Sequence, residues 1–214
     1  MRGEGASLHL SPKFARASCW DGAGSLGAVK VIALDRSKLD AAATLLVDGF
    51  AEHWPDAWPT LEAARSEVEQ ALASDRVALA AVDGGGELLG WIGGIPTDYG
   101  ATTWELHPLV VAAPAQGRGV GRALVTQLED RLAARGVVTL MLGSDDEDQM
   151  TSVGGCDLYP DVLMRLQRIE DRRGHPFGFY RRLGYEVIGV IPDANGFGKP
   201  DILMARRLMK AGNP

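Results

Sequence analysis

The pattern of hydrophobic and polar positions changes abruptly at Val29. Residues 1–28 are rich in Gly, Ser and Ala and show neither the 3.6-residue period of a helix nor the alternation of a strand. A patterned sequence begins at Val29 with VKVIAL, and no internal repeat or low-complexity linker divides it. We therefore expect a disordered extension over residues 1–28 and a single domain over residues 29–210.

The patterned part predicts short strands and helices joined by short connections. Strands are expected over residues 29–34, 77–82, 87–95, 103–111, 137–142, 185–191 and 201–208. Helices are expected over residues 39–50, 61–74, 119–135 and 176–183, with another within 157–171. Ser37 and Asp40 resemble a capping box ahead of the first helix, and Thr60 is expected to cap the second.

The turn sequence DGGG at residues 83–86 joins two of these strands and predicts a hairpin. Because hairpins are antiparallel, they exclude a purely doubly wound parallel sheet. We therefore predict an α+β fold in which helices flank a mixed, mostly antiparallel twisted sheet.

Charge narrows the class of partner. The 214 residues include 22 Lys and Arg against 28 Asp and Glu, which gives a formal charge of −6. A protein that neutralises nucleic-acid phosphates is usually basic, so this balance counts against a nucleic-acid partner. It favours a neutral or cationic partner.

The two cysteines do not indicate a metal site. Cys19 and Cys156 belong to no CxxC pair and have no histidine at metal-ligand spacing, so we expect two free thiols and no metal. No N-terminal apolar run has the length of a secretory signal, and none elsewhere approaches the roughly 18 residues of a membrane span. We expect a cytoplasmic protein that binds no membrane.

Residues 109–132 run from a strand through a glycine-rich turn into an amphipathic helix. Gly117, Gly119 and Gly121 leave the start of this helix bare of side chains, so its free N–H groups can approach an anion. The segment lacks the third glycine of a dinucleotide-binding GxGxxG and the GK[ST] of a P-loop. Taken alone, the turn indicates either a phosphate cradle of another kind or simple chain reversal.

Two motifs together resemble the GNAT N-acetyltransferase superfamily. Residues 116–121 (QGRGVG) fit its Q/R-x-x-G-x-G/A pattern, and PFGFYRRLGYEVIG, at residues 176–189, is similar to its FYxxLGF/Y segment. The resemblance implies acetyl-CoA as co-substrate, with its pyrophosphate at the glycine turn. The coenzyme-binding residues that it implies are Leu109, Val110, Val111, Gln116, Gly117, Arg118, Gly119, Val120, Gly121 and Arg122.

Five longer blocks resemble the aminoglycoside 6'-N-acetyltransferases of this superfamily, in particular the chromosomally encoded, homodimeric branch. They are WELHPLVV (104–111), LGSDDEDQMTS (142–152), DLYPDV (157–162), GHPFGFY (174–180) and IPDANGFGKPDILMA (191–205). This resemblance implies acetyl transfer to a primary amine of a polycationic sugar, a chemistry of antibiotic resistance, and a homodimer.

The strand over residues 103–111 carries candidate catalytic groups. Alternation places Glu105 and His107 on one face, and Pro108 removes a ladder donor, which predicts a bulge or a splayed edge. A splayed strand can offer a backbone N–H to the thioester oxygen. We expect Glu105 to be the base for the attacking amine, with His107 positioning substrate or water. Both residues also fit purely structural roles.

Tyr180 stands where the family carries the tyrosine that stabilises or protonates the leaving thiolate. A purely packing role is the alternative.

Candidate acceptor-binding residues follow the strand at 137–142. Asp145 and Asp146 begin an acidic run through residue 148 and match the family's acidic loop, and Asp161 is a further candidate. Trp54 and Trp58 fit a sugar site through stacking and cation–π contact. A solvated loop and ordinary core packing are the competing interpretations.

Two other functions stay open. The same chemistry suits a polyamine, a peptide or a small-metabolite amine, and the fold also suits a non-catalytic acyl-CoA sensor. A sensor needs only the coenzyme motif, so the presence of Glu105, His107 and Tyr180 favours an enzyme.

Overall fold

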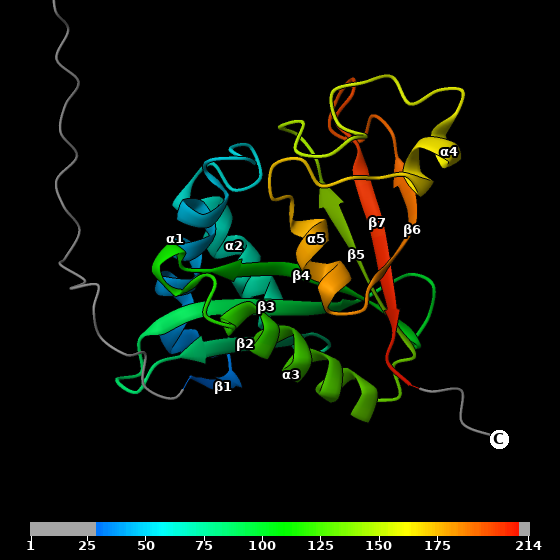
Figure 1. Cartoon of the computed structure of the whole chain (residues 1–214). Coiled ribbons are helices and arrows are strands. Elements are labelled where there is room, and N and C mark those ends of the chain that lie inside the picture. Colours follow the sequence, from blue (N-terminus) through cyan, green and yellow to red (C-terminus); the bar gives the residue numbers. More distant parts are fainter. Residues whose placement is uncertain (1–28, 210–214) are drawn as a thin grey trace, which may run out of the picture.

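The computed structural model describes residues 29–209, and the extension expected over residues 1–28, Cys19 included, lies outside this part (Figure 1). A seven-stranded mixed sheet has the order β1-β2-β3-β4-β5-β7-β6. Only the β4–β5 pair is parallel, and the other neighbours are antiparallel. The predicted α+β fold is confirmed.

The strands agree with the alternating segments to within a few residues. They run over Lys30–Ala33 (β1), Val77–Val82 (β2), Leu88–Pro96 (β3), Thr103–Val111 (β4), Thr139–Asp145 (β5), Glu186–Ile191 (β6) and Asp201–Arg207 (β7). The helices run over Leu39–Phe50 (α1), Leu61–Ala71 (α2), Val120–Ala134 (α3), Val162–Gln167 (α4) and Pro176–Arg182 (α5).

The first helix has the predicted bounds but not the predicted cap. Asp35, not Ser37, supplies the cap: its carboxylate accepts from Ser37 N at 2.8 Å at the start of a short 3-10 turn. Lys38 then precedes α1 without a side-chain cap, so the expected Ser37–Asp40 capping box is wrong. Thr60 caps α2 as predicted, because its Oγ1 accepts from Ala63 N at 3.2 Å.

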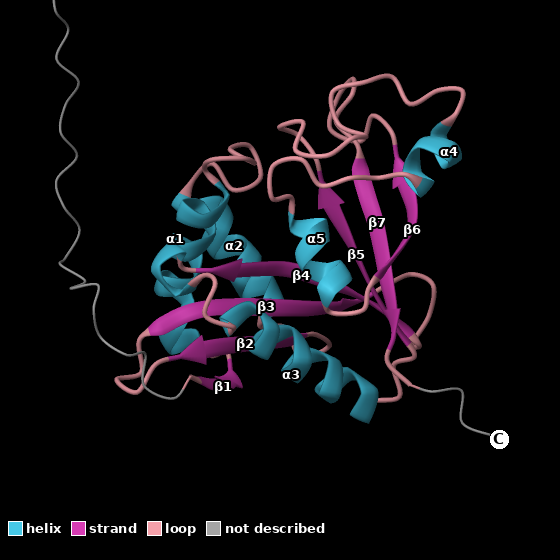
Figure 2. Ribbon diagram, viewed as in Figure 1, coloured by secondary structure: helices cyan, strands magenta, loops and turns pink. Residues whose placement is uncertain are grey.

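Two apolar clusters cover the two faces of the sheet. One joins α1 and α2 to the sheet through side chains that include Leu46, Val68 and Trp91. The other joins α3 and α5 to the opposite face through side chains that include Leu124 and Phe177. Figure 2 shows α5 in front of the opening between β4 and β5.

The sheet separates in its middle. β4 and β5 pair only over 103–105 and 139–141, and beyond these residues each strand keeps only its outer neighbour. A bulge accompanies this separation: Gly93 of β3 stands opposite both His107 and Pro108, as the proline predicted. The bulge shifts the alternation, so His107 and Val110 share the face of α1 and α2, while Leu109 packs with the α3 cluster.

Candidate active site

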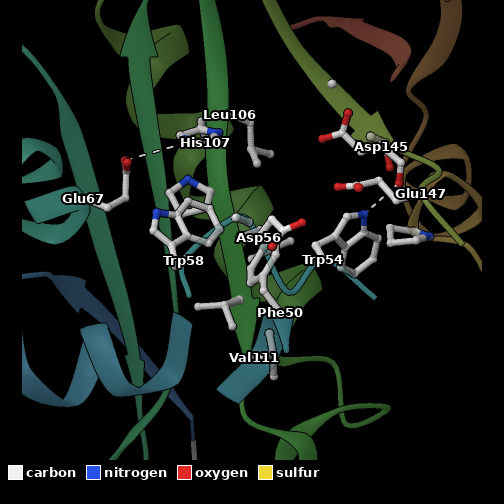
Figure 3. Close-up of a pocket in the computed structure, with 18 of the residues that line it drawn as sticks. Phe50, Trp54, Asp56, Trp58, Glu67, Leu106, His107, Val111, Asp145 and Glu147 are labelled. Atoms are coloured by element: carbon white, nitrogen blue, oxygen red, sulfur yellow. Dashed lines mark hydrogen bonds and ion pairs between the residues drawn. The ribbon is translucent and has the colours of Figure 1, made fainter. Parts of the chain in front are cut away.

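A cavity of about 760 Å³ opens where β4 and β5 separate (Figure 3). Its walls come from α1, α2 and the segment between them, from β4, from the end of β5 and the loop after it, from α5, and from the loop between β6 and β7. The polar and aromatic side chains that line it are Phe50, Trp54, Asp56, Trp58, Glu67, His107, Gln116, Ser144, Asp145, Glu147, Tyr180 and Asn195.

The structure brings many of the predicted site residues to this cavity. Those that line it are Trp54, Trp58, His107, Leu109, Val110, Val111, Gln116, Asp145 and Tyr180. Residues 117–122 of the glycine turn, together with Glu105, Asp146 and Asp161, lie outside the lining.

Glu105 does not line the cavity, although the next residue of β4, Leu106, does. It belongs to the short stretch where β4 still pairs with β5, opposite Met141. Its charge contributes to the raised pKa of Asp201, which places the two carboxyl groups near one another. A role for Glu105 at the reacting atoms therefore requires a bridging water.

His107 lies between an aromatic and an acidic neighbour (Figure 3). Its ring centroid is 5.8 Å from that of Trp58, and its Nε2 is 3.8 Å from Glu67 Oε1. Trp58 is itself held edge-on against Phe50, with a centroid distance of 4.6 Å. These neighbours fix where the imidazole meets the cavity.

Tyr180 reaches the cavity from α5 and is 7% exposed. Burial of its phenol raises its pKa well above the ordinary value of 10. Its ring lies 5.1 Å from Phe179 and 5.6 Å from Tyr185, centroid to centroid, both in edge-on arrangements. Tyr180 therefore keeps its proton at alkaline pH.

The four acidic residues at 145–148 have different surroundings. Asp145 and Glu147 line the cavity, and Glu147 pairs with Lys199 at 3.3 Å. Asp146 is fully buried and accepts from the backbone N–H groups of Met150 and Thr151 and from the Thr151 hydroxyl, at 2.7–2.8 Å. Its carboxylate therefore organises the loop and does not line the cavity.

Asp148 ends the run and links the segment between α1 and α2 to the loop before α5. Its Oδ2 lies 3.1 Å from His53 Nδ1 and 2.9 Å from a nitrogen of Arg173. The hydrogen bond from His53 and that from Arg173 lower the pKa of Asp148. Trp54 makes a parallel link, donating from Nε1 to the Asp145 carbonyl at 2.9 Å.

Asp201 adds a partly buried acid beside this wall. Burial first, and then the charges of Asp145 and Glu105, raise its pKa to about 6. Its Oδ1 is buried and has no hydrogen-bond partner within the described residues. Asp161, in contrast, precedes α4 as an exposed residue and does not reach the cavity.

Several residues that line the cavity were not predicted as site residues, among them Asp56, Glu67 and Asn195. Asp56 lies between the two tryptophans that were singled out, which was a usable signal. Glu67 follows the ordinary polar pattern of an amphipathic helix, and Asn195 lies in a loop, so neither carried a signal.

The glycine turn fits a phosphate group in front of α3. Gly117 and Gly119 have φ values of 71° and 85°, and no side chain caps the first turn of α3. A β-carbon at Gly121 would lie 3.3 Å from Phe179, so the close approach of α5 favours glycine here. Gln116 donates to the Val111 carbonyl at 3.0 Å and ties the turn to the end of β4.

Arg118 and Arg122 flank this turn with exposed side chains. Residues 109–111 and the turn thus form a continuous path from the cavity to a cationic helix start, which suits an extended phosphorylated coenzyme.

Residues 39–154, more than half of the chain, match the Acetyltransferase (GNAT) family. The chain belongs to the GNAT acetyltransferase family. It is an N-acetyltransferase that uses acetyl-CoA, as the family resemblance implied.

Solved structures of GNAT acetyltransferases resemble this chain over most of its length. An aminoglycoside 6'-N-acetyltransferase complexed with coenzyme A is 39% identical with a TM-score of 0.77, and the match covers 86% of this chain and 99% of that one. The aminoglycoside 6'-N-acetyltransferase from Enterococcus faecium is also 39% identical, with a TM-score of 0.76 and the same coverage of both chains. An aminoglycoside 6'-acetyltransferase type Ii is 35% identical, with a TM-score of 0.64 and again the same coverage of both chains. No curated protein sequence matches.

Within residues 29–209, no group of three or more His, Cys, Asp or Glu side chains could hold a metal ion. None of the described helices is long and apolar enough to cross a membrane.

Proposed function

We propose that this GNAT enzyme acetylates the 6'-amine of aminoglycosides in the cytoplasm and confers resistance to them. One observation carries the proposal: four carboxylates line the cavity and, among the described residues, no lysine or arginine does. The acidic side chains are Asp56, Glu67, Asp145 and Glu147. The 39% identity to two aminoglycoside 6'-N-acetyltransferases supports the same acceptor.

The acids stand on two opposite walls. Asp56 lies between α1 and α2 and Glu67 lies on α2, whereas Asp145 ends β5 and Glu147 follows it in the loop (Figure 3). An acceptor with several separated ammonium groups can pair with Asp56 on one wall and with Asp145 or Glu147 on the other, whereas a monoamine can pair with only one wall. The indole rings between them offer faces for a sugar ring and for cation–π contact.

The proposed chemistry follows from the order of groups along β4. Acetyl-CoA supplies the acetyl group as a thioester. Glu105, through a water, removes one proton from the acceptor ammonium, and His107 positions the acceptor. The amine then attacks the acetyl carbon, the C–N bond forms and the C–S bond breaks.

A second proton, lost from the same nitrogen after the C–N bond forms, accounts for the proton that the leaving thiolate gains. Tyr180 donates its phenolic proton to that thiolate and regains one from the newly formed amide nitrogen through the cavity. A backbone N–H of segment 109–111 stabilises the oxyanion. The net products are the amide, the free thiol and one proton.

The acceptor is tested by thiol release from acetyl-CoA. The matched pair is an aminoglycoside with a 6'-amine and one that carries a hydroxyl there, assayed beside spermidine and a peptide. We expect turnover only with the 6'-amine. Activity confined to spermidine or the peptide would overturn the proposal in favour of another amine, and coenzyme binding without turnover would indicate a sensor.

The base is tested by Glu105→Gln, with Glu87→Gln in the exposed β2–β3 turn as control. We expect the loss of turnover to be greatest at low pH, where the acceptor is fully protonated and most needs a base. Rates like those of the wild type across pH would remove Glu105 from this role.

We also propose a homodimer formed through the β6 edge. β6 ends the sheet, and exposed apolar side chains gather on β6 and the adjoining α4: Leu163, Met164, Ile188 and Ile191. An edge strand with apolar side chains is a surface that proteins usually cover. Sedimentation should give a dimer for the wild type and a monomer for Ile188→Glu. A monomeric wild type would contradict this assembly.

A further inference from the structure

We propose that Glu67 is a positioning residue that holds His107 with a lone pair directed at the cationic acceptor. The proposal rests on the proposed function, since it assigns His107 to acceptor binding. The observation behind it is the approach of Glu67 Oε1 to His107 Nε2 at 3.8 Å, on the cavity wall (Figure 3).

The fold places Glu67 there through the packing of α2. Val68, next in the chain, is fully buried, as are Ala64 and Ala71 on the same helix. This stripe anchors α2 against α1 and β3. Glu67 stands at its border, with a side chain only 18% exposed, and reaches His107 on β4 from the neighbouring layer.

The chemistry of imidazole gives this contact a consequence. A neutral histidine carries one N–H and one lone pair, and the partner of one nitrogen decides the role of the other. At 3.8 Å the negative charge of the Glu67 carboxylate favours the proton on Nε2, the nitrogen that it faces. Nδ1 is then left as an acceptor, which is the role that an ammonium group requires.

The neighbouring aromatic ring supports the same orientation. Trp58 lies 5.8 Å from the His107 ring, centroid to centroid, and is braced by Phe50. The imidazole is thus confined by Trp58 while Glu67 selects its tautomer. The pair resembles other carboxylate–histidine pairs, in which the acid sets the tautomer of the histidine and does not touch the substrate.

A double-mutant cycle tests whether Glu67 acts through His107. We expect Glu67→Ala to raise the acceptor KM about tenfold while the KM for acetyl-CoA stays within about twofold, which is the effect of losing one such interaction. Glu67→Gln keeps a carbonyl oxygen near Nε2 but removes the negative charge, so it should restore part of the affinity. Glu69→Ala, exposed on the same helix, is the matched control.

The decisive comparison is made in the His107→Gln background. There Glu67→Ala should change the acceptor KM by less than about twofold, because its effect has already been removed. The full effect in that background would show direct contact of Glu67 with the acceptor and would overturn the proposal. No effect of Glu67→Ala in the wild-type background would overturn it too.

A spectroscopic readout separates this proposal from the choice of acceptor. Ring nitrogen-15 shifts of labelled histidine, with His107 identified by its absence in His107→Gln, report the tautomer at a pH where imidazole is neutral. We expect the Nε2–H form alone in the wild type and detectable Nδ1–H form in Glu67→Ala. The same tautomer composition in both proteins would overturn the proposal, whichever amine the enzyme acetylates.

Discussion

Asp145 and Asp146 are neighbours in the chain with opposite surroundings. Asp145 lines the cavity, whereas Asp146 is fully buried beneath the loop and accepts three hydrogen bonds from Met150 and Thr151. The two acids come from one charged run, yet only Asp145 can contact an acceptor amine in the cavity.

This difference predicts distinct effects of two substitutions. Asp146→Ala leaves buried N–H groups without a partner and should cost about 3–5 kcal/mol of the free energy of unfolding. Asp145→Ala should leave the Tm nearly unchanged and raise the acceptor KM. Thermal unfolding and steady-state kinetics measure both. A change in acceptor KM without loss of stability in Asp146→Ala would contradict this assignment.

The raised pKa of Asp201 predicts a pH dependence of stability. Burial and the nearby acids bring this pKa from 3.8 to about 6, so the folded protein binds the proton more tightly than the unfolded chain. The contribution of Asp201 to stability is therefore present below about pH 4 and is lost as pH rises to about 6.

Asp201→Asn removes this titration. At neutral pH we expect its Tm to exceed that of the wild type by about 2–4 °C, and the difference should vanish toward pH 4. Parallel Tm profiles across this range would contradict the expectation.

Tyr180→Phe should lower kcat by about 100-fold, because the phenol is the proposed proton donor to the leaving thiolate. Its pKa lies well above 10, so deprotonation of Tyr180 does not account for an alkaline limb in the wild-type profile. Tyr99→Phe, at a position that is 82% exposed, is the matched control. A modest loss with unchanged pH dependence would reduce Tyr180 to a positioning role.

Gly93→Ala should disrupt the bulge that presents His107. A β-carbon at Gly93 would run into the carbonyl oxygen of His107, which is backbone and cannot rotate away. We expect a loss of about 1–3 kcal/mol in unfolding free energy together with a lower kcat/KM. Gly84→Ala, where no atom lies within 4 Å of the added carbon, should change neither. A wild-type kcat/KM in Gly93→Ala would show that the bulge is dispensable.

Local patterns predicted the strands and the bulge because both depend on neighbouring residues. Alternation located β4, and Pro108 indicated the break in its ladder. The cap ahead of α1 was predicted wrongly because the capping-box pattern pointed to Ser37, and only the course of the backbone brings the Asp35 carboxylate to Ser37 N.

The candidate site was predictable where a motif marks it and not where packing between distant segments creates it. Tyr180 and Gln116 stand in motifs and reach the cavity. Glu67 meets His107 across the contact between two layers, which no local pattern records. Charge alone could not distinguish Asp145 from Asp146, because burial decides their roles.

The three-residue pairing between β4 and β5 divides the sheet into two modules with separate hydrogen-bond ladders. The module β1–β4 carries His107 on one wall of the cavity, and the module β5–β7 carries Asp145 on the other. A substitution in one module leaves the ladder of the other intact. Acceptor preference can therefore diversify during evolution one wall at a time, while the path to the coenzyme along β4 is retained.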